Sequence, residues 1–165
     1  MILPALKEAE TPFVRPIKYS LFPPLGLATL ASYLSPDDGI DLQDQHVETL
    51  NQNDEPDLVI IQVYITNAYR AYKIADHYRT KGSYVILGGL HVTSLPEEAA
   101  IHADSIFIGP GEDTFPAFLK DFKNKSPKKR YISVLRTLKN ALTVRRDLIK
   151  RAHNLVPNSL VVPRG

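Results

Sequence analysis

The sequence predicts an α/β fold in which helices flank a parallel sheet. Short apolar runs rich in β-branched residues alternate with helical patterns through residues 1–122. This alternation is typical of repeated βα units. The strongest run, residues 58–63, is almost continuously apolar, as expected of a central strand that is buried on both faces.

The first part of the chain predicts strand, helix, strand. Residues 1–6 open with an apolar run and predict the first strand. Residues 25–34 are apolar nearly all round and follow two prolines, which suit the first turn of a helix, so a buried helix is expected there. Residues 35–39 contain proline and glycine and end this helix, and residues 40–44 are a weak second strand.

The middle of the chain holds the clearest signals. After the third strand, at 58–63, apolar residues recur at helical spacings of three and four. They are Ala68, Ala71, Tyr72, Ala75 and Tyr78. Thr66 or Asn67 is expected to cap this helix and Gly82 to end it. Residues 84–87 predict the fourth strand.

The last βα units are shorter. Residues 94–97 have the capping-box pattern and predict a short helix that continues through Ala99 and Ala100. Residues 105–108 predict the fifth strand. A last helix is expected at 114–122, with Asp113 placed to cap it.

Five strands joined by short crossovers predict a flavodoxin-like parallel sheet of order 2-1-3-4-5, with helices on both faces. Ligands in such sheets bind beyond the carboxyl ends of the strands, where the winding direction reverses between strands 1 and 3. The expected site therefore lies among the loops at about 5–25, 64–67, 88–94 and 109–113.

Composition excludes several classes of chemistry. There is no cysteine, which excludes disulfides, a thiolate zinc site, a cysteine nucleophile and an iron–sulfur cluster ligated by this chain. Zero cysteine fits a cytoplasmic protein. No apolar run reaches the roughly 18 residues of a membrane span, so we expect no membrane association.

The near-neutral net charge hides two different parts. Residues 1–122 carry 8 Lys and Arg against 17 Asp and Glu, whereas residues 123–165 carry 12 against 1. We therefore expect an α/β domain at 1–122 and a basic linker or tail at 123–165. Phosphates attract such a cluster, but the tail has only Tyr131 as a stacking aromatic, so nucleic-acid binding is not favoured.

Two glycine-rich turns end neighbouring strands of the predicted sheet. Gly88-Gly89 follows the fourth strand and Gly109-Pro110-Gly111 follows the fifth. Glycines at such ends permit positive φ and let a ligand approach the backbone, although a tight turn explains them equally well. Neither turn is a phosphate-binding GxxxxGK[ST] loop, and no GxGxxG follows the first strand, so nucleoside triphosphates and dinucleotides are not expected.

Histidines and carboxylates form no convincing catalytic or metal site. Asp44-Gln45-His46 resembles the DxHxxG motif whose histidine ligates cobalt, but it follows the second strand rather than the first and lacks the glycine. His46 is therefore interpreted as a solvated loop histidine. The acidic residues of a phosphoacceptor receiver are also missing after strands 1 and 3.

Four segments, in order, resemble one known family. Residues 23–34 resemble PPLGLAYLAAYL, and residues 56–61 look like that family's third strand. Residues 87–99 are similar to LGGxHxTxxPEEA and residues 108–112 to the G-x-GE turn. The family is the cobalamin (vitamin B12)-binding N-terminal domain of cobalamin-dependent radical S-adenosylmethionine enzymes, with magnesium-protoporphyrin IX monomethyl ester cyclase-like enzymes among its members.

The resemblance implies a module that holds cobalamin, without a DxHxxG histidine ligand, against a radical S-adenosylmethionine barrel in the same parent chain. That barrel would bind a 4Fe-4S cluster and S-adenosylmethionine, so this chain alone would be non-catalytic and its parent methyltransferase-like or cyclase-like. In such enzymes the linker leads to the first cluster cysteine one residue beyond Gly165, which suggests truncation. The alternative is a cofactor-free structural or docking domain of the same fold.

The resemblance also implies which residues would line the cofactor. The corrin side would be approached by Tyr64, Ile65 and Thr66. The nucleotide tail would be lined by Gly88, Gly89, Leu90, His91, Val92, Gly109, Pro110, Gly111 and Glu112. No metal-ligating or catalytic residue is expected in the chain.

Overall fold

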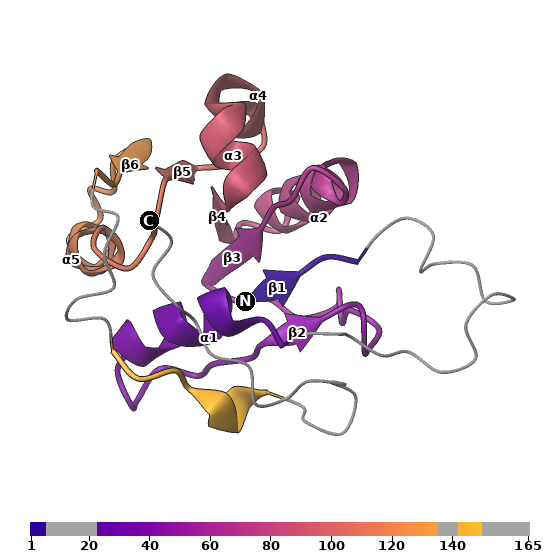
Figure 1. Ribbon diagram of the computed structural model, residues 1–165, viewed down its shortest axis with the longest axis horizontal. Coiled ribbons are helices and arrows are strands. Elements are labelled where there is room, and N and C mark those ends of the chain that lie inside the picture. Colours follow the sequence, from indigo (N-terminus) through magenta and orange to yellow (C-terminus); the bar gives the residue numbers. More distant parts are fainter. Residues whose placement is uncertain (6–22, 135–141, 150–165) are drawn as a thin grey trace, which may run out of the picture.

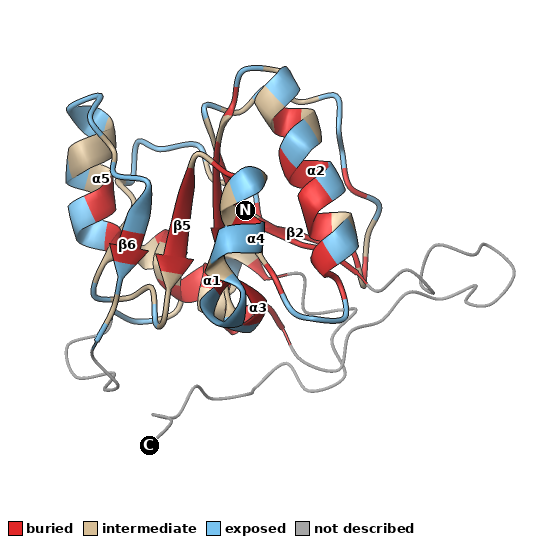
Figure 2. Cartoon of the chain, turned by 90° about the horizontal axis from the view of Figure 1, so that it is seen from above, coloured by how far each residue is buried: buried red, intermediate tan, exposed pale blue. Residues whose placement is uncertain are grey.

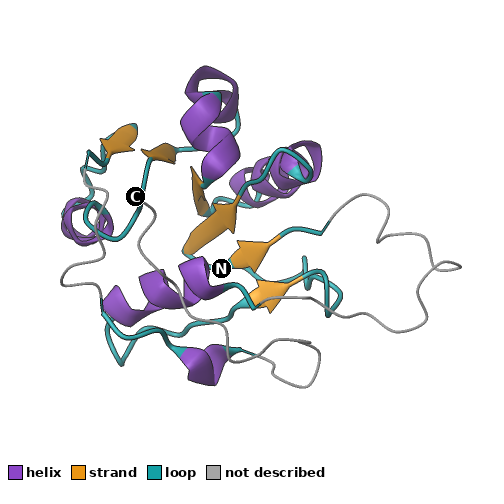
Figure 3. Ribbon diagram, in the orientation of Figure 1, coloured by secondary structure: helices purple, strands orange, loops and turns teal. Residues whose placement is uncertain are grey.

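The structure, a computed structural model, describes residues 1–5, 23–134 and 142–149. Its strands form one parallel sheet of order β2-β1-β3-β4-β5-β6 (Figure 1). Helices lie on both sides of this sheet (Figure 3). The predicted α/β class and the order of the first five strands are confirmed, and a sixth strand is added.

The elements have the following bounds. The strands are β1 Ile2–Leu3, β2 Gln43–Asp44, β3 Leu58–Gln62, β4 Tyr84–Gly88, β5 Ser105–Ile108 and β6 Arg130–Ile132. The α-helices are α1 Leu25–Leu30, α2 Ala68–Thr80, α3 Leu90–Ser94, α4 Pro96–Ile101 and α5 Phe115–Lys123. Two 3-10 turns are η2 Ala31–Tyr33 and η3 Arg146–Leu148. None of the helices in the described part of the chain is long and apolar enough to cross a membrane.

The sheet separates two core layers. Because successive side chains of a strand point to opposite faces, Val59 and Ile61 of β3 join the layer under α2, α3 and α4. Ile60, between them, joins the layer under α1 and α5. Ile61 is fully buried, and Val59 and Ile60 are 2% and 5% exposed. Figure 2 shows similar burial along β5, which is coloured red over most of its length. The continuous apolar run at 58–63 therefore reflects burial on both faces, as predicted.

The sheet continues beyond residue 122, where the sequence predicts only a basic linker. Tyr131 of β6 is 4% exposed, and its ring stacks on Phe107 of β5 with centroids 5.1 Å apart. Its hydroxyl donates a hydrogen bond to Oδ2 of Asp121, 2.9 Å away. Tyr131 is thus a core residue and is not available for stacking on nucleic-acid bases.

Another part of the basic segment also packs onto the domain. Ile149 is buried in the same layer as α1, and the backbone N–H of Arg145 donates to the carbonyl of Ala28 over 3.1 Å. The apolar run predicted to be strand-like at 159–162 lies outside the described residues.

Two predicted caps, those expected for α4 and α5, are wrong, and Asn67 lies at the N-cap of α2 without a side-chain cap bond. The capping box at 94–97 does not form, because α3 already begins at Leu90 and Ser94 is its last residue. The Ser94 hydroxyl donates back to the carbonyl of Leu90, 3.0 Å away, and α4 begins separately at Pro96. At α5 the N-cap is Thr114 rather than Asp113.

Helix α5 ends in a backbone conformation that suits glycine, yet a lysine occupies it. Lys125 has φ +56°, and its N–H donates to the carbonyl of Phe122 over 2.9 Å. Because glycine pays no steric penalty there, we expect Lys125→Gly to raise the free energy of unfolding by about 0.5–1 kcal/mol. Lys123→Gly, inside the last turn of α5, should lower it by about 1 kcal/mol. Urea denaturation of both variants measures this, and a destabilised Lys125→Gly would contradict it.

Candidate functional site

Large apolar side chains are exposed where β3 and β4 end. Tyr64 and Ile65 follow β3 and are 36% and 79% exposed, and Leu90, at the start of α3, is 58% exposed. These loops lie at the carboxyl edge of the sheet, where parallel α/β folds bind ligands. Apolar side chains grouped on a surface commonly mark a binding site.

The loop after β3 is a hydrogen-bonded turn that presents its side chains outward. The N–H of Val63 donates to the carbonyl of Gly88 over 2.7 Å, and that of Asn67 donates to the carbonyl of Tyr64 over 3.1 Å. The Tyr64 hydroxyl accepts a hydrogen bond of 2.8 Å from Nε2 of Gln62. Tyr64, Ile65 and the exposed Thr66 are thus brought together at this edge on a defined backbone.

The positive-φ glycines of the edge are required by the protein's own backbone. Gly89 has φ +114°, and a Cβ there would lie 2.6 Å from the carbonyl oxygen of Val63. Gly109 has φ +83°, and its Cβ would lie 2.9 Å from the carbonyl oxygen of Ser133. The tight-turn interpretation therefore explains these two glycines without a ligand.

The other two glycines of these turns, Gly88 and Gly111, also pack within the domain. A Cβ on Gly88 would lie 3.4 Å from Cβ of Phe107, and one on Gly111 would lie 3.3 Å from Cδ2 of Leu30. Pro110 is exposed and Glu112 is half-buried. Of this turn, Pro110 is the residue most open to a ligand.

His91 and Val92 point inward, toward the helices. Because α3 begins at Leu90, the next two residues turn under it, and they are 8% and 0% exposed. Nε2 of His91 lies 3.2 Å from Oε1 of Glu98 on α4. This hydrogen bond holds the pKa of the Glu98 carboxyl below its usual range.

An aromatic stack extends this contact across the helix layer. The ring of Tyr72 on α2 lies 6.1 Å from that of His91 and stacks on His102 at 4.4 Å. Burial raises the pKa of the Tyr72 hydroxyl, so this phenol stays protonated at neutral pH. Nδ1 of His102 lies 2.9 Å from Oδ2 of Asp76. His91 therefore joins α2, α3 and α4.

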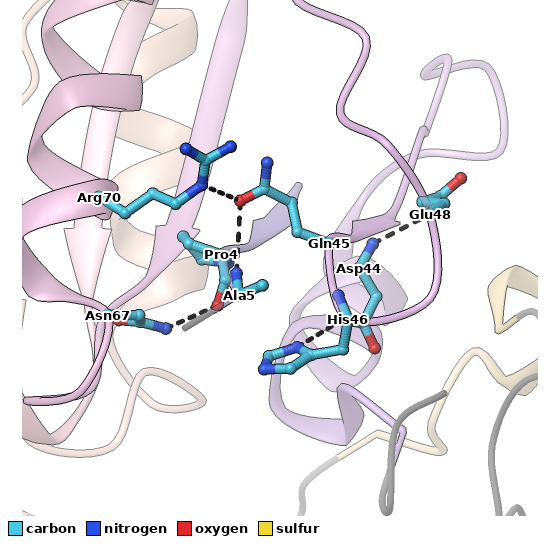
Figure 4. A network of polar contacts seen from close by, with 8 residues as sticks. All are labelled: Pro4, Ala5, Asp44, Gln45, His46, Glu48, Asn67 and Arg70. Carbon is cyan, nitrogen blue, oxygen red and sulfur yellow. Dashed lines mark hydrogen bonds and ion pairs between the residues drawn. The ribbon is translucent and has the colours of Figure 1, made fainter. Parts of the chain in front are cut away.

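A polar network that the sequence did not predict joins the ends of β1 and β2 to the first part of α2 (Figure 4). Nδ2 of Asn67 donates to the carbonyl of Pro4 over 2.9 Å, and its Oδ1 accepts from the N–H of Tyr64 over 2.8 Å. On the other side, Oε1 of Gln45 accepts from the N–H of Ala5 and from Nε of Arg70. Asparagine at a helix N-cap is so common that nothing local in the sequence indicated this use of Asn67.

His46 is held by Asp44 rather than freely solvated. Its side chain is 26% exposed, and Nδ1 lies 2.8 Å from Oδ1 of Asp44, which also accepts from the His46 N–H. His46 is therefore a partly exposed loop histidine, and its contact with Asp44 is an addition that the sequence did not predict. No group of three or more metal-ligating side chains occurs among the described residues.

Comparison with known proteins identifies the fold family. Residues 19–119 match the family of B12-binding domains. The chain belongs to this family. Its expected identity as a B12-binding domain is therefore confirmed, and the exposed loops after β3 and β4 lie at the edge of a B12-binding domain.

The curated relatives of this B12-binding domain are methyltransferases. It is 40% identical over 110 residues to bacteriochlorophyllide d C-8(2)-methyltransferase of Chlorobaculum tepidum, covering 66% of this chain and 24% of that protein. It is 36% identical over 70 residues to the C-12(1)-methyltransferase of the same organism, covering 42% and 15%. An uncharacterized methyltransferase of Pyrococcus horikoshii is 30% identical over 128 residues, covering 70% and 27%. The chain thus spans about a quarter or less of these relatives' length.

Substitution of Gly89 tests the backbone packing at the edge. Gly89→Ala should lower the free energy of unfolding by about 2–4 kcal/mol, because the Cβ adds a clash with Val63 to the strain of positive φ. Gly82→Ala is the matched control, because Gly82 has φ +89° but a Cβ there would have no neighbouring atom within 4 Å. This variant should lower the free energy of unfolding by about 1 kcal/mol. Equal losses in chemical denaturation would show that the Val63 contact is unimportant.

Proposed function

We propose that the domain binds cobalamin at the carboxyl edge of its sheet. The observation that carries the proposal is the exposure of Tyr64, Ile65 and Leu90 at this edge of a B12-binding domain. A corrin ring is broad and flat with apolar faces, so burying these side chains against it is favourable. Apolar loops without a convergent acid–base pair favour holding a cofactor over catalysis by the chain itself.

Different residues of the edge would contact different parts of cobalamin. Tyr64, Ile65 and Thr66 would face the corrin, and no histidine of a DxHxxG motif would ligate the metal. Bound cobalamin would supply a cobalt centre that carries a methyl group, chemistry that belongs to the cofactor. Leu90, Pro110 and Glu112 would border the nucleotide tail.

The other predicted residues would act through the backbone. The four turn glycines, Gly88, Gly89, Gly109 and Gly111, would shape the turns on which the nucleotide tail rests. His91 and Val92 would support the edge from beneath, since both are buried.

The parent protein is inferred to be a radical S-adenosylmethionine enzyme that transfers a methyl group or closes a ring. Similarity to methyltransferases, of which the chain spans about a quarter or less, supports a module of a larger enzyme. The barrel would bring the 4Fe-4S cluster and S-adenosylmethionine to the cofactor edge. Residues 1–122, extended by β6, would form the cobalamin module, and the following basic segment would lead to the barrel.

Retention of hydroxocobalamin tests the proposal. Purified folded domain, mixed with hydroxocobalamin and desalted, should keep the cofactor's visible absorbance. Ile65→Asp should weaken binding about tenfold, because it places a charge on an apolar contact. Ile65 is 79% exposed, so the free energy of unfolding should change little.

A matched control makes the result specific. Ile101, at the end of α4, is 71% exposed, and Ile101→Asp should bind hydroxocobalamin like the unmodified domain. Folded domain that retains no cofactor would overturn the proposal and favour a cofactor-free docking domain. Equal weakening by both variants would place the corrin elsewhere.

A further inference from the structure

Asn67 occupies the N-cap of α2 but does not cap it. Asparagine at this position normally accepts a hydrogen bond from an N–H of the first helical turn, yet the α2 N-cap makes no such side-chain bond. Asn67 is 4% exposed, and both ends of its amide are engaged elsewhere. Asn67 therefore makes hydrogen bonds outside the helix in place of the usual N-cap bond.

The two ends of the Asn67 amide join the ends of two strands. Oδ1 accepts from the N–H of Tyr64, just beyond β3. Nδ2 donates to the carbonyl of Pro4, just beyond β1 (Figure 4). The strands β1 and β3 are paired only through Ile2 and Ile61. Asn67 therefore spans the place where the two strands separate, at the switch in winding direction.

The end of β1 is held from its other side as well. Oε1 of Gln45 accepts from the N–H of Ala5 at 3.3 Å and from Nε of Arg70 on α2 at 2.8 Å. The Pro4 carbonyl and the Ala5 N–H, which are consecutive polar groups of one backbone, are each met by a side-chain amide. The end of β1 is thus fixed between β2 and α2.

We propose that Asn67 is the positioning residue of the Tyr64–Thr66 loop, which it holds against the end of β1 in the geometry that receives the cofactor. This inference rests on the proposed cobalamin function. The role needs an amide, because one end must accept from Tyr64 while the other donates to Pro4. A carboxylate accepts only and would set an anionic oxygen against the Pro4 carbonyl.

Asn67→Asp is the sharpest variant for this proposal. It keeps an acceptor for Tyr64, and its negative charge at the start of the α2 helix is favourable, so the domain should stay folded. Hydroxocobalamin should bind about tenfold more weakly, as expected from the loss of one buried hydrogen bond. Asn53→Asp, in the exposed loop before β3, makes the same chemical change away from the edge and should leave binding unchanged.

The pH dependence separates positioning from general destabilisation. A protonated aspartic acid regains an O–H that donates to the Pro4 carbonyl. Asn67 is 4% exposed, and burial disfavours a charged carboxylate, so the pKa of the introduced carboxyl should lie above the ordinary aspartate value. The ratio of dissociation constants, Asn67→Asp over the unmodified domain, should therefore fall as the pH is lowered from about 8 to about 4. A ratio near one at every pH, or one that does not change with pH, would overturn the inference.

Amide hydrogen exchange tests the same role without any cofactor. In Asn67→Ala the N–H of Tyr64 loses its acceptor, so it should exchange about tenfold faster or more, while amides within β4 keep their rates. Unchanged exchange at Tyr64 would overturn the positioning role even if cobalamin binds. Faster exchange in a domain that binds no cobalamin would support the loop contact and overturn the cofactor function alone.

Discussion

The structure depends on β1, a strand of only two residues that joins both halves of the sheet. It pairs with β2 through Ile2 and Leu3 but with β3 through Ile2 alone. Ile2 enters one core layer and Leu3 the other, and both are buried. Beyond Leu3 the strand makes no further ladder, and buried backbone groups there need partners. The side-chain amides of Asn67 and Gln45 are these partners, so they replace the hydrogen bonds that a longer strand would make.

Most of the fold could be predicted because its signals are local. The run at 58–63 and the helical spacing of α2 each follow from a period in the sequence, and both are where they were expected. Strand β6 has no such period. Tyr131 is buried because Phe107 of β5 and Asp121 and Phe118 of α5 contact it. A strand made by tertiary contacts in a lysine-rich segment carries no pattern of its own.

In the site, too, local features could be predicted from the sequence, whereas features that depend on tertiary contacts could not. The sequence located the turns at Gly89 and Gly109 correctly, because glycines after buried strands predict a change of direction. It could not show that the spaces beside them are filled by Val63 and Ser133 rather than by a ligand. His91 was likewise placed at the edge, but the early start of α3 turns it inward to Glu98. Tertiary packing decides whether a turn residue faces the protein or solvent, and this packing cannot be predicted from a single sequence.

Exposed apolar residues and a fixed loop backbone belong together at this edge. While Ile65 stays exposed, its side chain contributes little hydrophobic free energy to folding. A partner that covers it would gain that free energy on binding. Binding is strongest when the loop need not be ordered at the same time. An uncapped α2 costs on the order of 1 kcal/mol, and the domain carries this cost while Asn67 ties Tyr64 to Pro4. Local rules are commonly broken at functional positions, and the uncapped Asn67 lies two residues after Ile65, the most exposed apolar residue of the edge.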